Sequence, residues 1–249
     1  MALPYALLVA IAVSLLAWRA GALVRSGAIA AAVIGTQTLT GAGWPGGLVL
    51  MAFFLPSSAI SRLWPGLAAA GDAKGDRRDA WQVLANGGFP ALALTLGGPG
   101  TLMAFAAGLA AAAADTWATA VGAHSASPPR HILGGGVVPP GTSGGVTPLG
   151  SLGASAGAAL VAVSAVPLVG WRGAAAALLI GLGGMFLDSA LGAAVQGRFH
   201  CDHCDAASER TVHRCGHATR LLGGWRLLSN DGVNALASLA ATVAGWAVS

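Results

Sequence analysis

Residues 101–122 read TLMAFAAGLAAAAADTWATAVG, a run in which Asp115 is the single charged side chain. A helix needs about 20 mostly apolar residues to cross the hydrocarbon core of a bilayer. The run is continuous and rich in alanine and leucine, without the alternation of a barrel strand. It therefore predicts a membrane-spanning helix.

The rest of the 249-residue chain has the same character. Hydrophobic residues make up 55% of it, charged residues only 9%, and the mean hydropathy is +0.70. A soluble domain carries about 25% charged residues. The sequence thus predicts an all-α fold: a polytopic membrane helix bundle of seven to eight helices, forming a single integral-membrane domain over residues 1–249. Eight spans are expected, at 3–18, 24–40, 45–60, 83–98, 101–122, 147–169, 173–196 and 231–248.

The basic residues predict an orientation. If the N-terminus is outside, twelve of the thirteen lysines and arginines fall in cytoplasmic loops, as the positive-inside rule requires, and only Arg172 does not. The net charge of +4 then reflects membrane orientation, so no nucleic-acid partner is expected. The lipid bilayer is the expected partner, and no pattern in the sequence indicates an oligomeric state.

A glycine- and proline-rich segment, 138–150, lies between two apolar runs on the predicted cytoplasmic side. Its glycines allow close approach of the backbone to a ligand, and a helix starting near Thr147-Pro148 would direct its positive end to the same place. The segment suits a phosphate or anion cradle, and the alternative is a flexible turn between two membrane helices. The candidate cradle residues are Gly141, Thr142, Ser143, Gly144 and Gly145.

Two acidic residues, Asp115 and Asp188, lie inside or at the ends of predicted spans. A carboxylate in hydrocarbon is unfavourable by roughly 2.5–3.5 kcal/mol, so such a residue faces the protein interior and has a partner. Two of them near the cytoplasmic ends of neighbouring helices would hold Mg²⁺, which prefers carboxylate oxygens together with substrate phosphates. The alternative is a structural role, in hydrogen bonds or ion pairs.

Amides and basic residues supply further candidates. Asn86 lies one helical turn after Gln82, and Asn234 one turn after Asn230, with Asp231 as a third possible Mg²⁺ ligand. These side chains would bind a ligand or a metal, or else form interhelical bonds or a helix cap at residues 230–231. In the loop between 62 and 78, Lys74 and Arg78 are either phosphate ligands or ordinary positive-inside charges.

The loop 197–229 is rich in cysteine and histidine and is predicted to be cytoplasmic. Cys201 and Cys204 form a CxxC pair, and His213 and Cys215 an HxC pair, which together provide the four ligands of a tetrahedral structural Zn²⁺ site. Free or redox-active thiols, or no special role, are the alternatives. A disulfide is not expected in the cytoplasm.

Five motifs, taken in order, resemble one known family. They are QVLANGG at 82–88, ADTWAT at 114–119, VPPGTSGGV at 138–146, DSALGAAVQ at 188–196 and NDGVN at 230–234. From about Ser26 to its C-terminus the chain resembles the integral-membrane family, long of unknown function, that includes the plant phytyl-phosphate kinase of tocopherol synthesis. Where this family usually has a glutamate, the chain has Ala120.

The resemblance implies a multi-pass membrane protein. For a relative of the kinase it implies Mg²⁺-dependent transfer of a phosphoryl group from a nucleoside triphosphate, ATP or CTP, to an isoprenoid monophosphate. Asp115 and Asp188 would then be the catalytic carboxylates, and Ala120 leaves open whether the activity is retained. A transporter or flippase of a phosphorylated lipid, or a lipid-phosphate nucleotidyltransferase, is the alternative.

Overall fold

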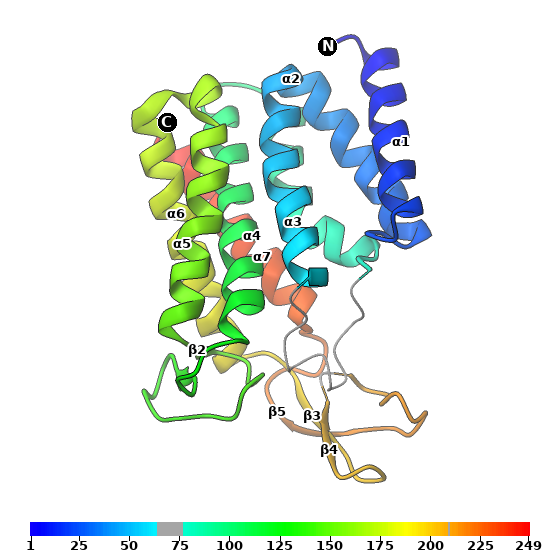
Figure 1. Cartoon of the computed structure of the whole chain (residues 1–249), viewed down its shortest axis with the longest axis vertical. Coiled ribbons are helices and arrows are strands. Elements are labelled where there is room, and N and C mark those ends of the chain that lie inside the picture. Colours follow the sequence, from blue (N-terminus) through cyan, green and yellow to red (C-terminus); the bar gives the residue numbers. More distant parts are fainter. Residues whose placement is uncertain (64–76, 209) are drawn as a thin grey trace.

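A computed structural model describes residues 1–63, 77–208 and 210–249, and over these residues the chain forms a helical bundle with short strands at one end (Figure 1). The helices of the described part are α1 (Leu3–Arg19), α2 (Arg25–Leu63), α3 (Ala80–Leu96), α4 (Thr101–Gly122), α5 (Pro148–Ser164), α6 (Val166–Ala194) and α7 (Asn230–Ala247). The strands are β1 (Arg130–His131), β2 (Gly145–Val146), β3 (Arg198–Cys201), β4 (Ala206–Ser208) and β5 (Arg220–Gly223).

The expected helical bundle is confirmed, whereas the count of eight spans is not. Among the described residues, α2, α4 and α6 are long and apolar enough to cross a membrane, and α1 and α5 are shorter apolar helices. The expected spans 24–40 and 45–60 both lie in α2. The short strands were also not expected, because runs of two to four residues carry too little periodicity to be recognised.

Helix α2 consists of two arms that meet at Gly43, whose backbone is non-helical (φ 62°, ψ −156°). Glycine adopts this positive φ without strain, and Pro45 has no N–H with which to continue the helix across the break. The second arm returns toward the start of the first: a Cβ on Gly21 would lie 3.4 Å from Arg62 Nη2. The break at Gly43 therefore separates the two segments that hydropathy predicts as separate spans.

Helix α4 forms the centre of the bundle. Nearly every side chain from Thr101 to Ala114 is buried, and α4 packs against α2, α3, α5, α6 and α7. Glycines on the neighbouring helices allow close contact with its alanines: Gly181 meets Ala110, and Gly245 meets Ala107. Such small-residue contacts are the usual basis of helix association in lipid, where burial of apolar surface provides no driving force.

The polar segments gather at one end of the bundle (Figure 1). The antiparallel pair β1–β2 and the sheet of order β4-β3-β5 both lie there, and the two chain termini lie at the opposite end. For the described loops, this agrees with the expectation that the long loops share one side. The assignment of that side to the cytoplasm remains a prediction.

We expect Gly157→Ala to destabilise the protein, because the new Cβ would lie 2.8 Å from both the Ala113 carbonyl oxygen and Trp117 Cγ. Overpacking of this kind costs about 1–3 kcal/mol, so the midpoint of thermal unfolding in detergent should fall. Gly183→Ala is the matched control, since a Cβ there meets no atom within 4 Å. Its midpoint should hold or rise, because alanine is the better helix former; equal losses in both variants would contradict the packing role of Gly157.

Candidate functional site

Two acidic side chains and two amides from four helices line one small cavity. Asp115 of α4, Asp188 of α6, Asn86 of α3 and Asn234 of α7 border a space of about 10 Å³. This is roughly the room that one water molecule needs. The structure thus brings together four of the residues that the sequence singled out.

The packing of α4 against α6 explains why the two carboxylates meet. Gly181 contacts Ala110 and Gly184 contacts Ala111, so the contacts advance along both helices in the same direction, as in a parallel pair. Side chains four residues apart lie on one helical face. Asp188 follows Gly184 by four residues, and Asp115 follows Ala111 by four. Both carboxylates therefore lie one turn beyond the same close contact.

The amides are oriented by hydrogen bonds. Asn234 Nδ2 donates to Asp188 Oδ2 at 2.8 Å and to the Asn230 carbonyl at 3.3 Å, in the amide orientation that satisfies both groups. Asn86 Nδ2 donates to the Gln82 carbonyl at 2.9 Å within its own helix. The Asn86 side-chain oxygen is thus the atom through which this amide would act as a ligand.

The electrostatics of the cavity are unbalanced. Asp188 is buried and Asp115 is half-buried, and none of the nine residues that line the cavity carries a positive charge. Two carboxylates that share a site of low dielectric repel each other unless a cation or a proton is present. The arrangement therefore suits a small cation with oxygen ligands.

The remaining acidic and amide candidates lie elsewhere. Asp231 lines a separate groove between α3 and α7, and the Asn230 side chain is exposed. The prediction of a helix cap at residues 230–231 is one residue too late. Ser229 caps α7, and its Oγ accepts a hydrogen bond from Gly232 N at 3.4 Å. A serine that precedes two other good capping residues is difficult to single out by sequence.

The glycine-rich segment forms a tight turn against α6. Gly141 and Gly144 have positive φ angles (83° and 79°), and a Cβ on Gly144 would lie 2.4 Å from Ala193 Cβ and 2.8 Å from the Ser189 carbonyl. Thr142 Oγ1 donates to the Pro139 carbonyl at 2.7 Å, and Gly145 N donates to the Thr142 carbonyl at 2.9 Å. Several donors of the segment thus maintain its own shape, while Gly144 packs beside the residue that follows Asp188.

Helix α5 begins where the sequence predicts. Thr147 caps it by accepting a hydrogen bond from Gly150 N at 2.9 Å, and Pro148 occupies the first turn. The first turn packs closely on the end of α4, where a Cβ on Gly150 would lie 2.9 Å from the Ala118 carbonyl. The glycine-rich turn is thereby held between the ends of α4 and α6.

Of the basic candidates, Arg78 is placed by the structure, and Lys74 lies outside the described residues. The Arg78 backbone bridges Ala22 and Val24, and its guanidinium lies 5.5 Å from the centre of the Phe53 ring. Burial lowers the pKa of Arg78 to about 10, which leaves it charged at neutral pH. Arg78 does not line the carboxylate cavity. It is a separate positive charge just before the start of α3.

Sequence reasoning missed Ser238, which lines the cavity and donates to the Asn86 carbonyl at 3.4 Å. A serine among alanines on a membrane helix resembles another small packing residue. Its spacing of four residues from Asn234 is the available sequence signal that both share one helical face. Ala120, which replaces the glutamate of the family pattern, is half-buried near the end of α4 and is not among the nine lining residues.

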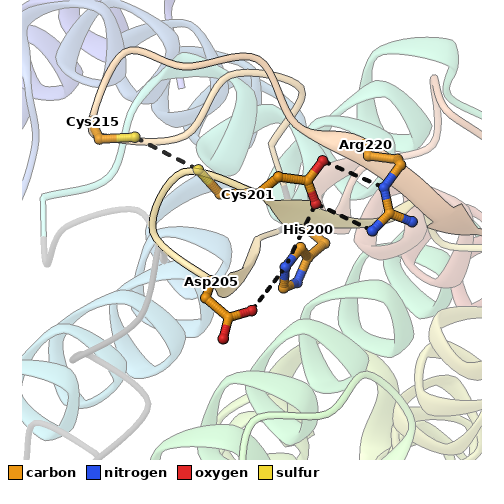
Figure 2. A network of polar contacts seen from close by, with 6 residues as sticks. His200, Cys201, Asp205, Cys215 and Arg220 are labelled. Atoms are coloured by element: carbon orange, nitrogen blue, oxygen red, sulfur yellow. Dashed lines mark hydrogen bonds and ion pairs between the residues drawn. The ribbon is translucent and has the colours of Figure 1, made fainter.

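The cysteine–histidine loop forms a second, separate site. Cys201 and Cys204 lie on the hairpin between β3 and β4, while His213 and Cys215 lie in a turn closed by the Val212–Ala218 bridge. Their ligand atoms all lie within 4.8 Å of one another, and the sulfurs of Cys201 and Cys215 are 3.6 Å apart (Figure 2). Zinc–sulfur bonds of about 2.3 Å in a tetrahedron place sulfurs roughly 3.8 Å apart. The residues present fit zinc.

The thiols of this site are free and electrostatically different. A hydrogen bond with His213, 3.1 Å from the sulfur, lowers the pKa of Cys215 to about 5, so this side chain is a thiolate at neutral pH. A hydrogen bond with Cys215 raises the pKa of Cys204 to about 11. Binding of a metal would release the remaining thiol protons.

The spare histidines have other contacts. His200 Nε2 lies 3.2 Å from Asp205 Oδ1 and 3.7 Å from Asp202 Oδ1, and Arg220 bonds Asp202 as well (Figure 2). His203 and His217 lie near Cys215, but their rings stack 3.8 Å apart at an angle of 10°. Because imidazole binds a metal in the plane of its ring, two parallel rings cannot both bind one ion, and the set Cys201, Cys204, His213 and Cys215 remains the better one.

We expect the purified protein to contain one zinc ion per chain, and Cys201→Ser to lose it. Cys201 is fully buried, so its loss also leaves the core of the small sheet unsupported. Elemental mass spectrometry of metal content provides the measurement. His200→Ala, which removes a neighbouring histidine with other partners, should keep the zinc. A protein that binds no zinc, or loses it equally in both variants, would contradict this ligand set.

Comparison with known proteins agrees with a membrane bundle. A family described as integral membrane protein DUF92 matches residues 8–242. Protein PGR of Arabidopsis thaliana is 27% identical over an alignment of 264 residues, which covers 92% of this chain and 90% of that protein. No solved structure matches the chain. The chain therefore belongs to the DUF92 family of integral membrane proteins.

Proposed function

We propose that this protein transfers a phosphoryl group from a nucleoside triphosphate, ATP or CTP, to an isoprenoid monophosphate in the membrane. The observation that carries the proposal is the pair of carboxylates, Asp115 and Asp188, at one cavity whose lining contains no cation. Phosphoryl transfer needs little covalent chemistry from a protein. It depends on positioning and on positive charge around the moving phosphate.

Mg²⁺ is the cation that we assign to this cavity. Asp115 and Asp188 would hold it, with the side-chain oxygens of Asn86 and Asn234 as further ligands. Carboxylate and amide oxygens are hard ligands that suit Mg²⁺, which usually keeps contacts to substrate phosphates as well. When bound, the ion would neutralise the charge that develops on the phosphates.

The other candidates would position the substrates. Residues 141–145 pack on α6 next to Ser189, so they adjoin the helix of Asp188. We assign them to one of the phosphates, which would bind the donors that the turn does not already use. Arg78, and Lys74 from the same loop, would bind further phosphate charge, and Asn230 would contribute at the start of α7. Asp231 becomes a less suitable metal ligand because it faces the groove between α3 and α7.

The isoprenoid nature of the acceptor rests on the motif resemblance, and the bilayer supplies the setting. The lipid chain of such a substrate remains in the membrane, while its phosphate lies at the end of the bundle that carries the loops. We place that end in the cytoplasm, where ATP is available, with the N-terminus outside.

We expect Mg²⁺ to raise the thermal unfolding midpoint of the purified protein. A ligand at 100 times its Kd stabilises a fold by about 2.7 kcal/mol. Asp115→Asn and Asp188→Asn should each lose most of this response, while Asp231→Asn should keep it. Loss in Asp231→Asn alone would move the metal to the other face of α7, and no response in the unmodified protein would remove Mg²⁺ from the proposal.

The activity itself is tested with purified protein in detergent, Mg²⁺, labelled ATP or CTP, and phytyl, geranylgeranyl or longer polyprenyl monophosphates. Labelled prenyl diphosphate is the expected product, and Asp115→Asn or Asp188→Asn should lower its rate by about 10²–10³-fold, as loss of a major electrostatic group does. Asp205→Asn is the matched control, because this exposed residue has φ 49°, a conformation that asparagine also tolerates.

Other outcomes would overturn the proposal in distinct ways. Movement of the lipid phosphate across liposomes without any transfer would identify a transporter or flippase. Label recovered in a nucleotidyl-lipid would identify a nucleotidyltransferase. Failure of transfer with every acceptor and donor would be the result expected if Ala120 marks a lost activity.

A further inference from the structure

We propose that the groove between α3 and α7 binds the hydrocarbon chain of the isoprenoid phosphate. This inference rests on the proposed function and names the substrate-binding surface for it. The groove has a volume of about 560 Å³ and is lined by α3 between Trp81 and Leu92 and by residues 229–235. Ligand sites for small molecules fall in the same range, about 300–1,000 Å³.

The groove has a polar end and an apolar length. Ser229 and Asp231 line it where α7 begins, at the end of the bundle that carries the loops. From Trp81 in the first turn of α3, the lining continues along that helix with Leu84, Phe89 and Leu92. A membrane amphiphile has the same order of groups, with its phosphate at the interface and its chain inside. Trp81 is 72% exposed, as is usual for tryptophan at a membrane interface.

Glycine keeps the middle of the groove open. A Cβ placed on Gly88 would meet only Leu84, at 3.9 Å, so the space above Gly88 is wide enough for further atoms. An isoprenoid chain carries a methyl branch on every fourth carbon and needs more width than a straight acyl chain. The open position at Gly88 therefore favours the branched chain among the hydrocarbons that the bilayer offers.

The groove and the carboxylate cavity share their walls. Ala85 faces the groove while its neighbour Asn86 faces the cavity, and Ala235 and Asn234 divide in the same way across α7. A chain in the groove thus lies one helix away from the carboxylates. Asp231 lines the mouth of the groove, so the phosphate of a bound lipid would lie beyond this carboxylate, at the end of the bundle that carries the loops.

The test uses photo-crosslinking with a geranylgeranyl monophosphate that carries a diazirine in its chain, on the full-length protein in detergent. The labelled peptides should come from α3 and α7. Gly88→Leu, which fills the groove, should reduce labelling about tenfold or more, the effect of one or two misplaced methylenes in an apolar pocket. Gly183→Leu is the matched control, because it places the same side chain at an exposed glycine of α6 with open space around it.

Folding is monitored by the thermal midpoints of both variants, and Gly88→Ala provides a milder version with a smaller expected loss. If transfer is active, Gly88→Leu should also raise KM more for long chains than for short ones, which a general loss of stability would not do. Labelling elsewhere, labelling that persists in Gly88→Leu, or equal competition by phosphatidylcholine would overturn the proposal. Labelling at α3 and α7 without any transfer would support the groove and count against the kinase alone.

Discussion

The close approach of small residues to α4 is the contact on which the rest of the structure depends. In a bilayer, helices are not driven together by burial of apolar surface, so they associate where backbones can touch. Ala107, Ala110 and Ala113 meet glycines from α7, α6 and α5 in turn. Each of these contacts fixes the depth and rotation of one neighbouring helix. The position of a side chain one turn farther along the same helix is therefore fixed as well, although that side chain takes no part in the close contact.

The carboxylate cavity is a product of this registration. Asp115 and Asp188 would be unfavourable on any helix that faced lipid, yet each lies one turn past a glycine–alanine contact that turns it inward. Asn234 reaches Asp188 from α7, whose own position is set by Gly245 against Ala107. The polar groups thus meet because the glycine–alanine contacts of these helices orient all of them toward the interior of the bundle. A bundle held together mainly by large side chains would allow more sliding and would place two buried charges less reliably.

Much of this could be predicted from the sequence, because its signals are local. Long apolar runs predict the helices, and the spacing of Cys201, Cys204, His213 and Cys215 predicts a ligand set that the structure brings within 4.8 Å. The pairing of Asp115 with Asp188 was only a hypothesis from sequence, since periodicity gives the face of a helix and not its neighbour. For the same reason Asp231 and Asn234, three residues apart on α7, could not be assigned to different pockets in advance.

The turns at the end of the bundle opposite the sheets have a consequence for how the molecule meets its surroundings. Gly43 breaks α2 there, residues 97–100 join α3 to α4, and Ala165 alone separates α5 from α6. Connections this short add few residues beyond the helix ends. Apart from the two termini, that end of the bundle has few loop residues that a protease could cleave or an antibody could bind. The described loops at the other end are long enough for both. Among the described residues, most of the segments that could contact water-soluble molecules therefore lie at one end of the bundle.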